Sequence, residues 1–182
     1  MPSRTLVSVD EYLNSSYRPD LEYVDGALVE RGLATIAHGL FQIILGSYFR
    51  IYRKQFGFAA LTDVRTQIIE RARYRIPDVM LCPVPLPSGK VVTSVPWVVI
   101  EILSPDDRLP DQLERFRDYK QIGVGNVILL DPEQLIAYRF DDGSLLQTRF
   151  TSLDLPSGSL AFDTAGLFQQ LVEERTEGGS SR

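Results

Sequence analysis

Short apolar runs recur along the chain, and polar or glycine-rich turns separate them. Runs of about four to eight residues that are rich in Val, Ile, Leu and Phe are typical of strands buried in a sheet. The dipeptide Asp25-Gly26 between the first two runs favours a two-residue hairpin turn. The pattern therefore predicts these strands: 21–24, 27–31, 58–61, 64–69, 74–81, 97–103, 126–130, 135–140 and 145–150.

Apolar residues at helical spacing occupy the stretches between many of these strands. Ser8 is placed to cap a short helix that ends at Asn14, with Glu11 as its capping-box partner. Thr35 caps a long helix that is ended by Gly57. The apolar positions of this long helix predict the face that it turns to the core: Ile36, Leu40, Ile43, Ile44, Tyr48 and Ile51. Two further helices are predicted: 110–122, which Pro110 opens, and 164–173.

Helices interspersed with mixed strands indicate an α/β fold. A chain of 182 residues, 44% hydrophobic and 24% charged, is long enough for one domain with a real core and too short for two ordinary ones. We predict a single domain over 1–175 and a flexible tail over 176–182, which is rich in Gly and Ser. No apolar run approaches the roughly 20 residues of a membrane span, and the N-terminus has no apolar signal core. With Cys82 as its one cysteine, the chain is expected to be cytoplasmic.

The formal net charge of −5 argues against a protein that coats nucleic acid through a broad basic surface. A small basic patch is still compatible with this charge. Arg71, Arg73 and Arg75 occupy alternate positions, so a strand would place all three side chains on one face. They form either a solvated hairpin tip or a phosphate-contacting ribbon that leads into Asp78.

Two carboxylates stand where strands do not need them. Asp78 follows Pro77 at an apolar strand, and Glu101 lies inside the apolar run 98–103. A buried charge costs several kcal/mol unless something binds it. The separation, 101 − 78 = 23 residues, fits neighbouring strands that point both carboxylates at one hard cation such as Mg²⁺. The alternatives are an Asp that closes a strand and a Glu in a buried salt bridge with an arginine.

These acids carry a resemblance to a known family. Ile76-Pro77-Asp78-Val79 and Glu101-Ile102-Leu103 resemble the PD-(D/E)XK signature of restriction endonuclease-like nucleases. Further motifs resemble, in order, the Uma-type endonuclease family: Glu22–Glu30, Ala37-His38-Gly39, Val99–Pro105, Tyr119, Gly123-Val124, Leu130-Asp131-Pro132, Phe162-Asp163 and Leu167-Phe168. The resemblance implies a restriction endonuclease-like core, a central mixed β-sheet flanked by helices, with an N-terminal helix and hairpin. It also implies cleavage of DNA by a homodimer that uses Mg²⁺, with Mn²⁺ as a possible substitute.

The resemblance further implies a set of site residues. Asp78 and Glu101, with the backbone carbonyl of Ile102 and several waters, would bind the metal. Glu30 would be a third acid of the site, and Glu22 is a weaker candidate for that role. Glu30 is otherwise a surface glutamate at the end of a strand.

The one histidine and one arginine complete this set. His38 would contact a phosphate or a water, although a lone histidine is more often structural. In this family the lysine expected two residues after the second acid is replaced by a lysine on the next helix; here Leu103 and Arg115 occupy these positions. Arginine cannot act as a base, but it can hold a phosphate or stabilise developing charge. The alternative for Arg115 is an ion pair with Asp111. Lys120 lies about 140° around the helix from Arg115, so it does not simply substitute.

Three functions therefore stay open. The first is a metal-dependent DNA endonuclease. The second is a nuclease-fold module that binds nucleic acid or metal without cutting. The third, which the acidic net charge favours, is a structural or regulatory oligomer without a nucleic-acid partner.

Overall fold

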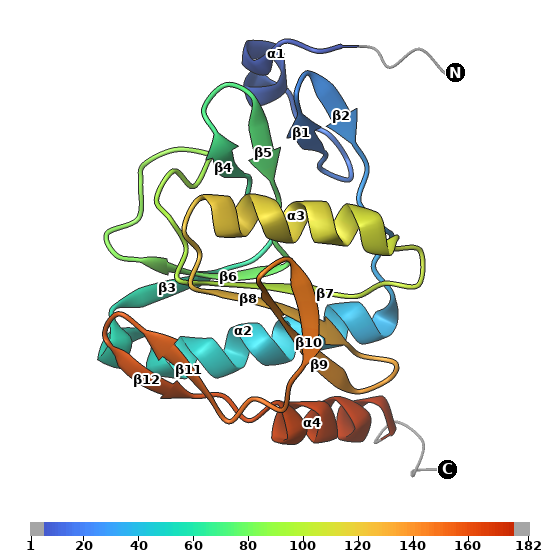
Figure 1. Cartoon of the computed structure of the whole chain (residues 1–182), viewed down its shortest axis with the longest axis vertical. Helices are drawn as coiled ribbons and strands as arrows, with labels where there is room; N and C mark the ends of the chain where they lie inside the picture. The colour runs from blue at the N-terminus through green and yellow to red at the C-terminus, as the bar shows by residue number, and fades with distance from the viewer. Residues whose placement is uncertain (1–5, 177–182) are drawn as a thin grey trace.

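The computed structural model describes residues 6–176 (Figure 1). Its helices are α1 (Val9–Asn14), α2 (Ile36–Phe56), α3 (Leu109–Gln121) and α4 (Thr164–Thr176). Its strands are β1 (Glu22–Val24), β2 (Ala27–Val29), β3 (Phe58–Leu61), β4 (Thr66–Ile69), β5 (Arg73–Arg75), β6 (Val79–Pro83), β7 (Val98–Ile102), β8 (Asn126–Asp131), β9 (Ile136–Asp141), β10 (Ser144–Gln147), β11 (Ser152–Leu155) and β12 (Gly158–Ala161). Thr176 ends α4, and the rest of the predicted tail lies outside the described residues. Within 6–176, no helix is long and apolar enough to cross a membrane.

A six-stranded sheet forms the centre of the fold. Its strand order is β10-β9-β8-β7-β6-β3; β7 and β8 are parallel, and the other neighbours are antiparallel. Helix α3 lies over one face of this sheet and α2 over the other, with α4 packed on the α2 side (Figure 1). The predicted α/β class, with a central mixed β-sheet flanked by helices, is confirmed.

Side chains of the central strands alternate between two apolar cores, one on each face of the sheet. On β7, Val98, Ile100 and Ile102 belong to the core on the α2 side. Val99 belongs to the core on the α3 side. Glu101 follows Val99 on the same face, so the alternation directs a carboxylate toward α3.

The strand predicted over 74–81 is in fact two strands of different sheets. β5 pairs with β1 and β4 in a smaller sheet of order β2-β1-β5-β4, whereas β6 pairs with β3 and β7 in the central sheet. Ile76, Pro77 and Asp78 link the two. Pro77 has no N–H to donate to a ladder, so an uninterrupted strand is disfavoured there. The break brings Asp78 to the start of β6, where the two sheets meet.

The N-terminal helix and hairpin form as predicted. The Ser8 hydroxyl accepts a hydrogen bond from the Glu11 amide (3.1 Å) at the start of α1. The β1–β2 turn places Asp25 and Gly26 at φ values of 50° and 91°, as a two-residue hairpin turn requires. The buried Tyr12 of α1 packs on Tyr23 and Tyr74 of the smaller sheet. Glu22 of β1 is buried in the same sheet.

Helix α2 has the predicted ends, but its buried face is only partly the predicted one. Thr35 caps it through the His38 amide (3.1 Å), and Gly57 ends it at a φ of 71°. However, Ile36, Ile43 and Ile51 are exposed by 82%, 67% and 74%. Ile44 is buried as predicted, and Leu40 and Tyr48 are partly buried against the core. The other buried positions are Ala37, His38, Phe41, Leu45, Phe49 and Phe56. This helix is apolar on more than one face, and the face with the phenylalanines removes more apolar area from water.

Candidate functional site

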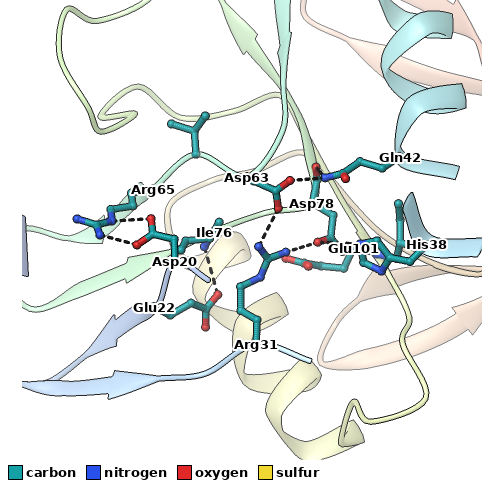
Figure 2. A network of polar contacts seen from close by, with 12 residues as sticks. Asp20, Glu22, Arg31, His38, Gln42, Asp63, Arg65, Ile76, Asp78 and Glu101 are labelled. Carbon is teal, nitrogen blue, oxygen red and sulfur yellow. Dashed lines mark hydrogen bonds and ion pairs between the residues drawn. The ribbon is translucent and has the colours of Figure 1, made fainter. Parts of the chain in front are cut away.

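The pairing of β6 with β7 brings the two predicted acids together. The strands are antiparallel, with Val79 opposite Ile100. One further step in this register sets Asp78 opposite Glu101, and directly opposite residues lie on one face of a sheet. Both residues are only 2% exposed. Their carboxylates lie side by side in Figure 2, and the amide of Ile102 donates to Asp78 Oδ2 at 2.7 Å.

Asp78 is held by cationic and polar groups from the loop after β2 and from α2. Arg31 forms an ion pair with Asp78 Oδ1 and reaches Asp63 Oδ1 with its other terminal nitrogen (2.8 Å; Figure 2). His38 Nε2 lies 3.4 Å from Asp78 Oδ1. Gln42 Nε2 donates to Asp63 Oδ2 (2.6 Å) and to the Asp78 carbonyl (2.9 Å). A guanidinium therefore already neutralises the first acid.

His38 lies in the first turn of α2, where it is buried between Asp78 and Ser104. Its Nδ1 is 3.0 Å from Ser104 Oγ. Burial works against protonation, but the hydrogen bond and charge of Asp78 outweigh it and raise the pKa of His38. Burial also opposes ionisation of Asp78, yet its contacts with His38, Arg31 and the Ile102 amide hold the pKa of Asp78 below its usual value.

Glu101 has the opposite electrostatic character. Burial, and then the charge of Asp78, raise the pKa of Glu101 well above its usual value, against the opposing charges of Arg115 and Arg31. The Tyr119 hydroxyl of α3 donates to Glu101 Oε1 at 2.6 Å. Adjacent carboxylates with pKa values moved apart are common at functional sites, where a bound cation would favour the ionised form of both.

Arg115 reaches the site from α3, anchored by a buried acid. Its Nε donates to Glu22 Oε2 at 3.2 Å, and Glu22 is fully buried. Glu22 also accepts from Arg75 Nη1 (2.8 Å) and from the Ile76 amide (3.2 Å). Among residues 6–176, Arg115 forms no ion pair with Asp111, so that alternative is wrong.

The alternating arginines lead to a similar correction. Arg75 and Arg73 both bind Asp118 of α3, with Arg75 Nε at 2.7 Å and Arg73 Nη1 at 2.7 Å. Arg71 lies in the turn before β5 and pairs with Asp10. The Arg73 and Arg75 guanidinium groups fasten the smaller sheet to α3, so neither the solvated tip nor the phosphate ribbon describes them.

Most predicted site residues line one small cleft. Its volume is about 10 Å³, room for about one water-sized group. Its walls include all these predicted residues: Asp78, Glu101, Ile102, His38 and Arg115. Glu30 is exposed after the end of β2 and instead lines a neighbouring cleft of about 210 Å³ that Arg115 shares. Glu22, the weaker candidate, is the buried acid that contacts Arg115.

Sequence reasoning missed several residues around this cleft, among them Arg31, Gln42, Asp107 and Gln112. Gln112 lines the cleft from α3 and is 1% exposed. Among the described residues its Oε1 atom has no hydrogen-bond partner, which is unusual for a buried oxygen. Gln112 precedes Arg115 by three positions, so helical spacing alone could have placed it on the same face.

The oxygen donors of the cleft are of the kind that Mg²⁺ prefers. Mg²⁺ usually keeps several waters and takes one or two carboxylates, which Asp78 and Glu101 supply. The unpaired Oε1 of Gln112 adds a neutral oxygen of the kind that hard cations or their waters prefer. Within 6–176 no group of three or more His, Cys, Asp and Glu side chains could hold a metal, so an all-protein cage does not fit.

Comparisons with known proteins agree with the fold. The Uma2 family, described as "Putative restriction endonuclease", matches residues 9–167. The crystal structure of "a putative nuclease belonging to DUF820" from Anabaena variabilis is 20% identical, with a TM-score of 0.75 over 91% of this chain and 99% of that one. A chain of the cryo-EM structure of a DrdV–DNA complex is 19% identical, with a TM-score of 0.38 over 74% of this chain and 11% of that one. No curated protein matches the chain.

Proposed function

The chain belongs to the Uma2 family, and we propose that it is a metal-dependent endonuclease that hydrolyses phosphodiester bonds in DNA. The observation that supports this proposal most strongly is the pair Asp78 and Glu101, two buried carboxylates side by side where β6 meets β7. A fold needs no such pair for stability, because adjacent buried carboxylates repel one another.

The proposed cofactor is Mg²⁺, with Mn²⁺ as a substitute. Asp78, Glu101 and the backbone carbonyl of Ile102 would hold the ion. When bound, it would supply Lewis-acid polarisation of the phosphate and lower the pKa of an attacking water.

The remaining groups would act by position and charge. Arg115 keeps its proton, so it would stabilise the negative charge that develops on the phosphoryl oxygens, and its pair with Glu22 fixes its direction. His38 would hold or pass a proton at Nε2, since Ser104 orients the other ring nitrogen. Arg31 would have to leave Asp78 before a cation takes its place, and Asp63 offers it a second partner.

Cleavage of supercoiled plasmid DNA tests this proposal. We expect nicked and linear products with Mg²⁺ or Mn²⁺, none with EDTA, and none from Glu101→Ala. Glu70→Ala is the matched control, because Glu70 is an exposed glutamate outside the cleft. Equal cleavage by wild type and Glu101→Ala would assign the activity to a contaminant. Wild-type protein that cuts neither DNA nor RNA with either metal would refute the proposed nuclease activity.

A nuclease-fold binding module without cleavage is the second candidate. Arg115 in the lysine position favours it, because an arginine cannot serve as a base. Duplex binding that persists in EDTA, without cleavage in Mg²⁺ or Mn²⁺, would select this candidate. A homodimer, the commonest soluble assembly, is proposed for either function; light scattering coupled to gel filtration would give a monomer mass if this is wrong.

A further inference from the structure

A groove outside the catalytic cleft runs between α2 and the edge strand β3. Its volume is about 480 Å³. Six α2 residues line it, and four of them are at spacings of four, four and three: Gln42, Gly46, Arg50 and Arg53. These spacings place all four on one face of the helix. The opposite wall is β3, through Ala59 and Ala60. We call this feature the α2–β3 groove.

The cations of this groove are not neutralised by carboxylates of the described residues, although Arg53 Nη1 donates to the Arg50 carbonyl at 2.7 Å. Arg50 and Arg53 are exposed, and within residues 6–176 neither forms an ion pair with a carboxylate. Arg73 and Arg75 show the contrast, since their guanidinium groups are occupied by acids. With Lys54, the last turns of α2 therefore carry uncompensated positive charge in a chain whose formal net charge is −5.

Among the described residues, the α2–β3 groove and the catalytic cleft share no lining residue, but a hydrogen bond links them. Gln42, at its near end, donates to the carbonyl of Asp78. Arg53 follows 53 − 42 = 11 positions later, a distance of about 16 Å at a rise of about 1.5 Å per residue. Along the axis of a duplex, one strand places a phosphate about every 3.4 Å, so about five phosphates of one strand cover this distance.

The walls of the groove allow a ligand to come close to the backbone of α2 and β3. Gly46 has no side chain, and a Cβ built there would meet no heavy atom within 4 Å. β3 is the outermost strand of the central sheet and pairs only with β6 within the described residues. An edge strand presents unpaired backbone N–H groups, which are common phosphate ligands in protein–DNA complexes.

We propose that the α2–β3 groove binds the sugar–phosphate backbone of duplex DNA on one side of the bond that the catalytic cleft cuts. This inference rests on the proposed function. It adds two phosphate ligands, Arg50 and Arg53, and a direction for the substrate along α2. A second copy of this chain, paired through β3, is the competing occupant.

Binding of a fluorescein-labelled duplex, measured by anisotropy in EDTA over a salt series, tests the groove. The test variant is Arg50→Ala/Arg53→Ala. The control variant is Arg117→Ala/Arg149→Ala, which removes two exposed arginines that lie outside the groove and form no ion pair within residues 6–176. The slope of log K against log salt is negative, and each lost phosphate contact reduces its magnitude by about 0.9. The slope of the test variant should therefore be about 1.8 less steep than that of wild type. Extrapolated from about 1 M to about 0.15 M salt, this is a loss of roughly 30-fold in affinity.

A charge-neutral pair of variants supplies the second arm. Gly46→Phe should block the groove and weaken binding, whereas Gly46→Ala adds one methyl group to open space and should bind as wild type does. Thermal unfolding checks that both variants fold.

Each outcome bears on the proposal separately from the activity. If wild type binds and cuts but the test and control variants behave alike, the groove inference is wrong and the endonuclease stands. If Arg50→Ala/Arg53→Ala changes only the oligomeric state, the groove belongs to a second copy of the chain. If wild type neither binds nor cuts, both proposals fail. Groove-dependent binding without cleavage would keep the groove and reject only the endonuclease.

Discussion

Removal of Arg31 is the sharpest test of how the site is held together. Arg31 bridges Asp63 and Asp78, and the side chain of Asp78 is 3% exposed. Breaking a buried ion pair by removing one partner costs about 3–5 kcal/mol, because the other charge stays buried. His38 and the Ile102 amide still hold Asp78 in the Arg31→Ala variant. We therefore expect the lower end of this range, about 3 kcal/mol.

This loss is measurable as a shift of the thermal midpoint. For a chain of this size each kcal/mol lowers the midpoint by about 2–4 °C, so Arg31→Ala in EDTA should melt about 6–12 °C below wild type. Arg71→Ala is the matched control. Its ion pair with Asp10 is exposed by 63% and 71%, and such pairs contribute about 0–1 kcal/mol.

Mg²⁺ should raise the thermal midpoint of Arg31→Ala more than that of wild type. If Arg31 stands where the charge of a cation is needed, Mg²⁺ competes with it in wild type but not in Arg31→Ala. Saturation at about 100 times the dissociation constant stabilises a protein by about 2.7 kcal/mol. Arg31→Ala should therefore gain more from Mg²⁺ than wild type does. Equal shifts in both proteins, or an Arg31→Ala midpoint near that of wild type in EDTA, would refute this account of the site.

Three further predictions address other groups. Gln112→Leu removes the unpaired Oε1, so the metal-free variant should unfold within about 1 kcal/mol of wild type and bind Mn²⁺ more weakly by electron paramagnetic resonance; unchanged Mn²⁺ affinity would make Gln112 structural. Arg115→Lys should raise the rate of plasmid cleavage and Arg115→Ala should abolish it. Because Arg115 forms a buried ion pair with Glu22, Arg115→Ala should also lower the thermal midpoint. Cleavage that is unaffected in both variants would remove Arg115 from the site. Burial raises the pKa of the Cys82 thiol to about 12, so the native chain should resist thiol reagents at mildly alkaline pH and react in denaturant, whereas rapid native labelling would show that β6 opens.

The elements that the sequence predicted well depend on local chemistry. The Asp25-Gly26 hairpin, the Thr35 cap and the Gly57 stop are each decided within a few residues, and all three form. The β11–β12 hairpin was missed, because Pro156 and Gly158 interrupt its short apolar alternation. The strand over 74–81 failed for a related reason: an apolar run does not reveal that it changes sheets partway along.

The candidate site divides in the same way. Asp78 and Glu101 were predictable as a pair, since each is a carboxylate among apolar strand residues and the two strands are neighbours. Arg31 was not predicted and Glu22 was only a weaker candidate, because their importance comes from partners 47 and 93 positions away in the chain, Asp78 and Arg115. Such contacts depend on how the two sheets and α3 meet, which no local pattern encodes.

Net charge shows most clearly what the sequence leaves out. A charge of −5 argued against a broad basic surface that coats nucleic acid, yet a sum over the chain ignores which charges are already paired. Asp118 and Glu22 are buried and bind arginines, so these acids contribute little to the field outside. Arg50 and Arg53 keep their charge exposed in the α2–β3 groove. A phosphate backbone responds to the local field within about 8–10 Å at physiological salt. At this range the positive charge of the α2–β3 groove would act on it more strongly than the net charge of the whole chain.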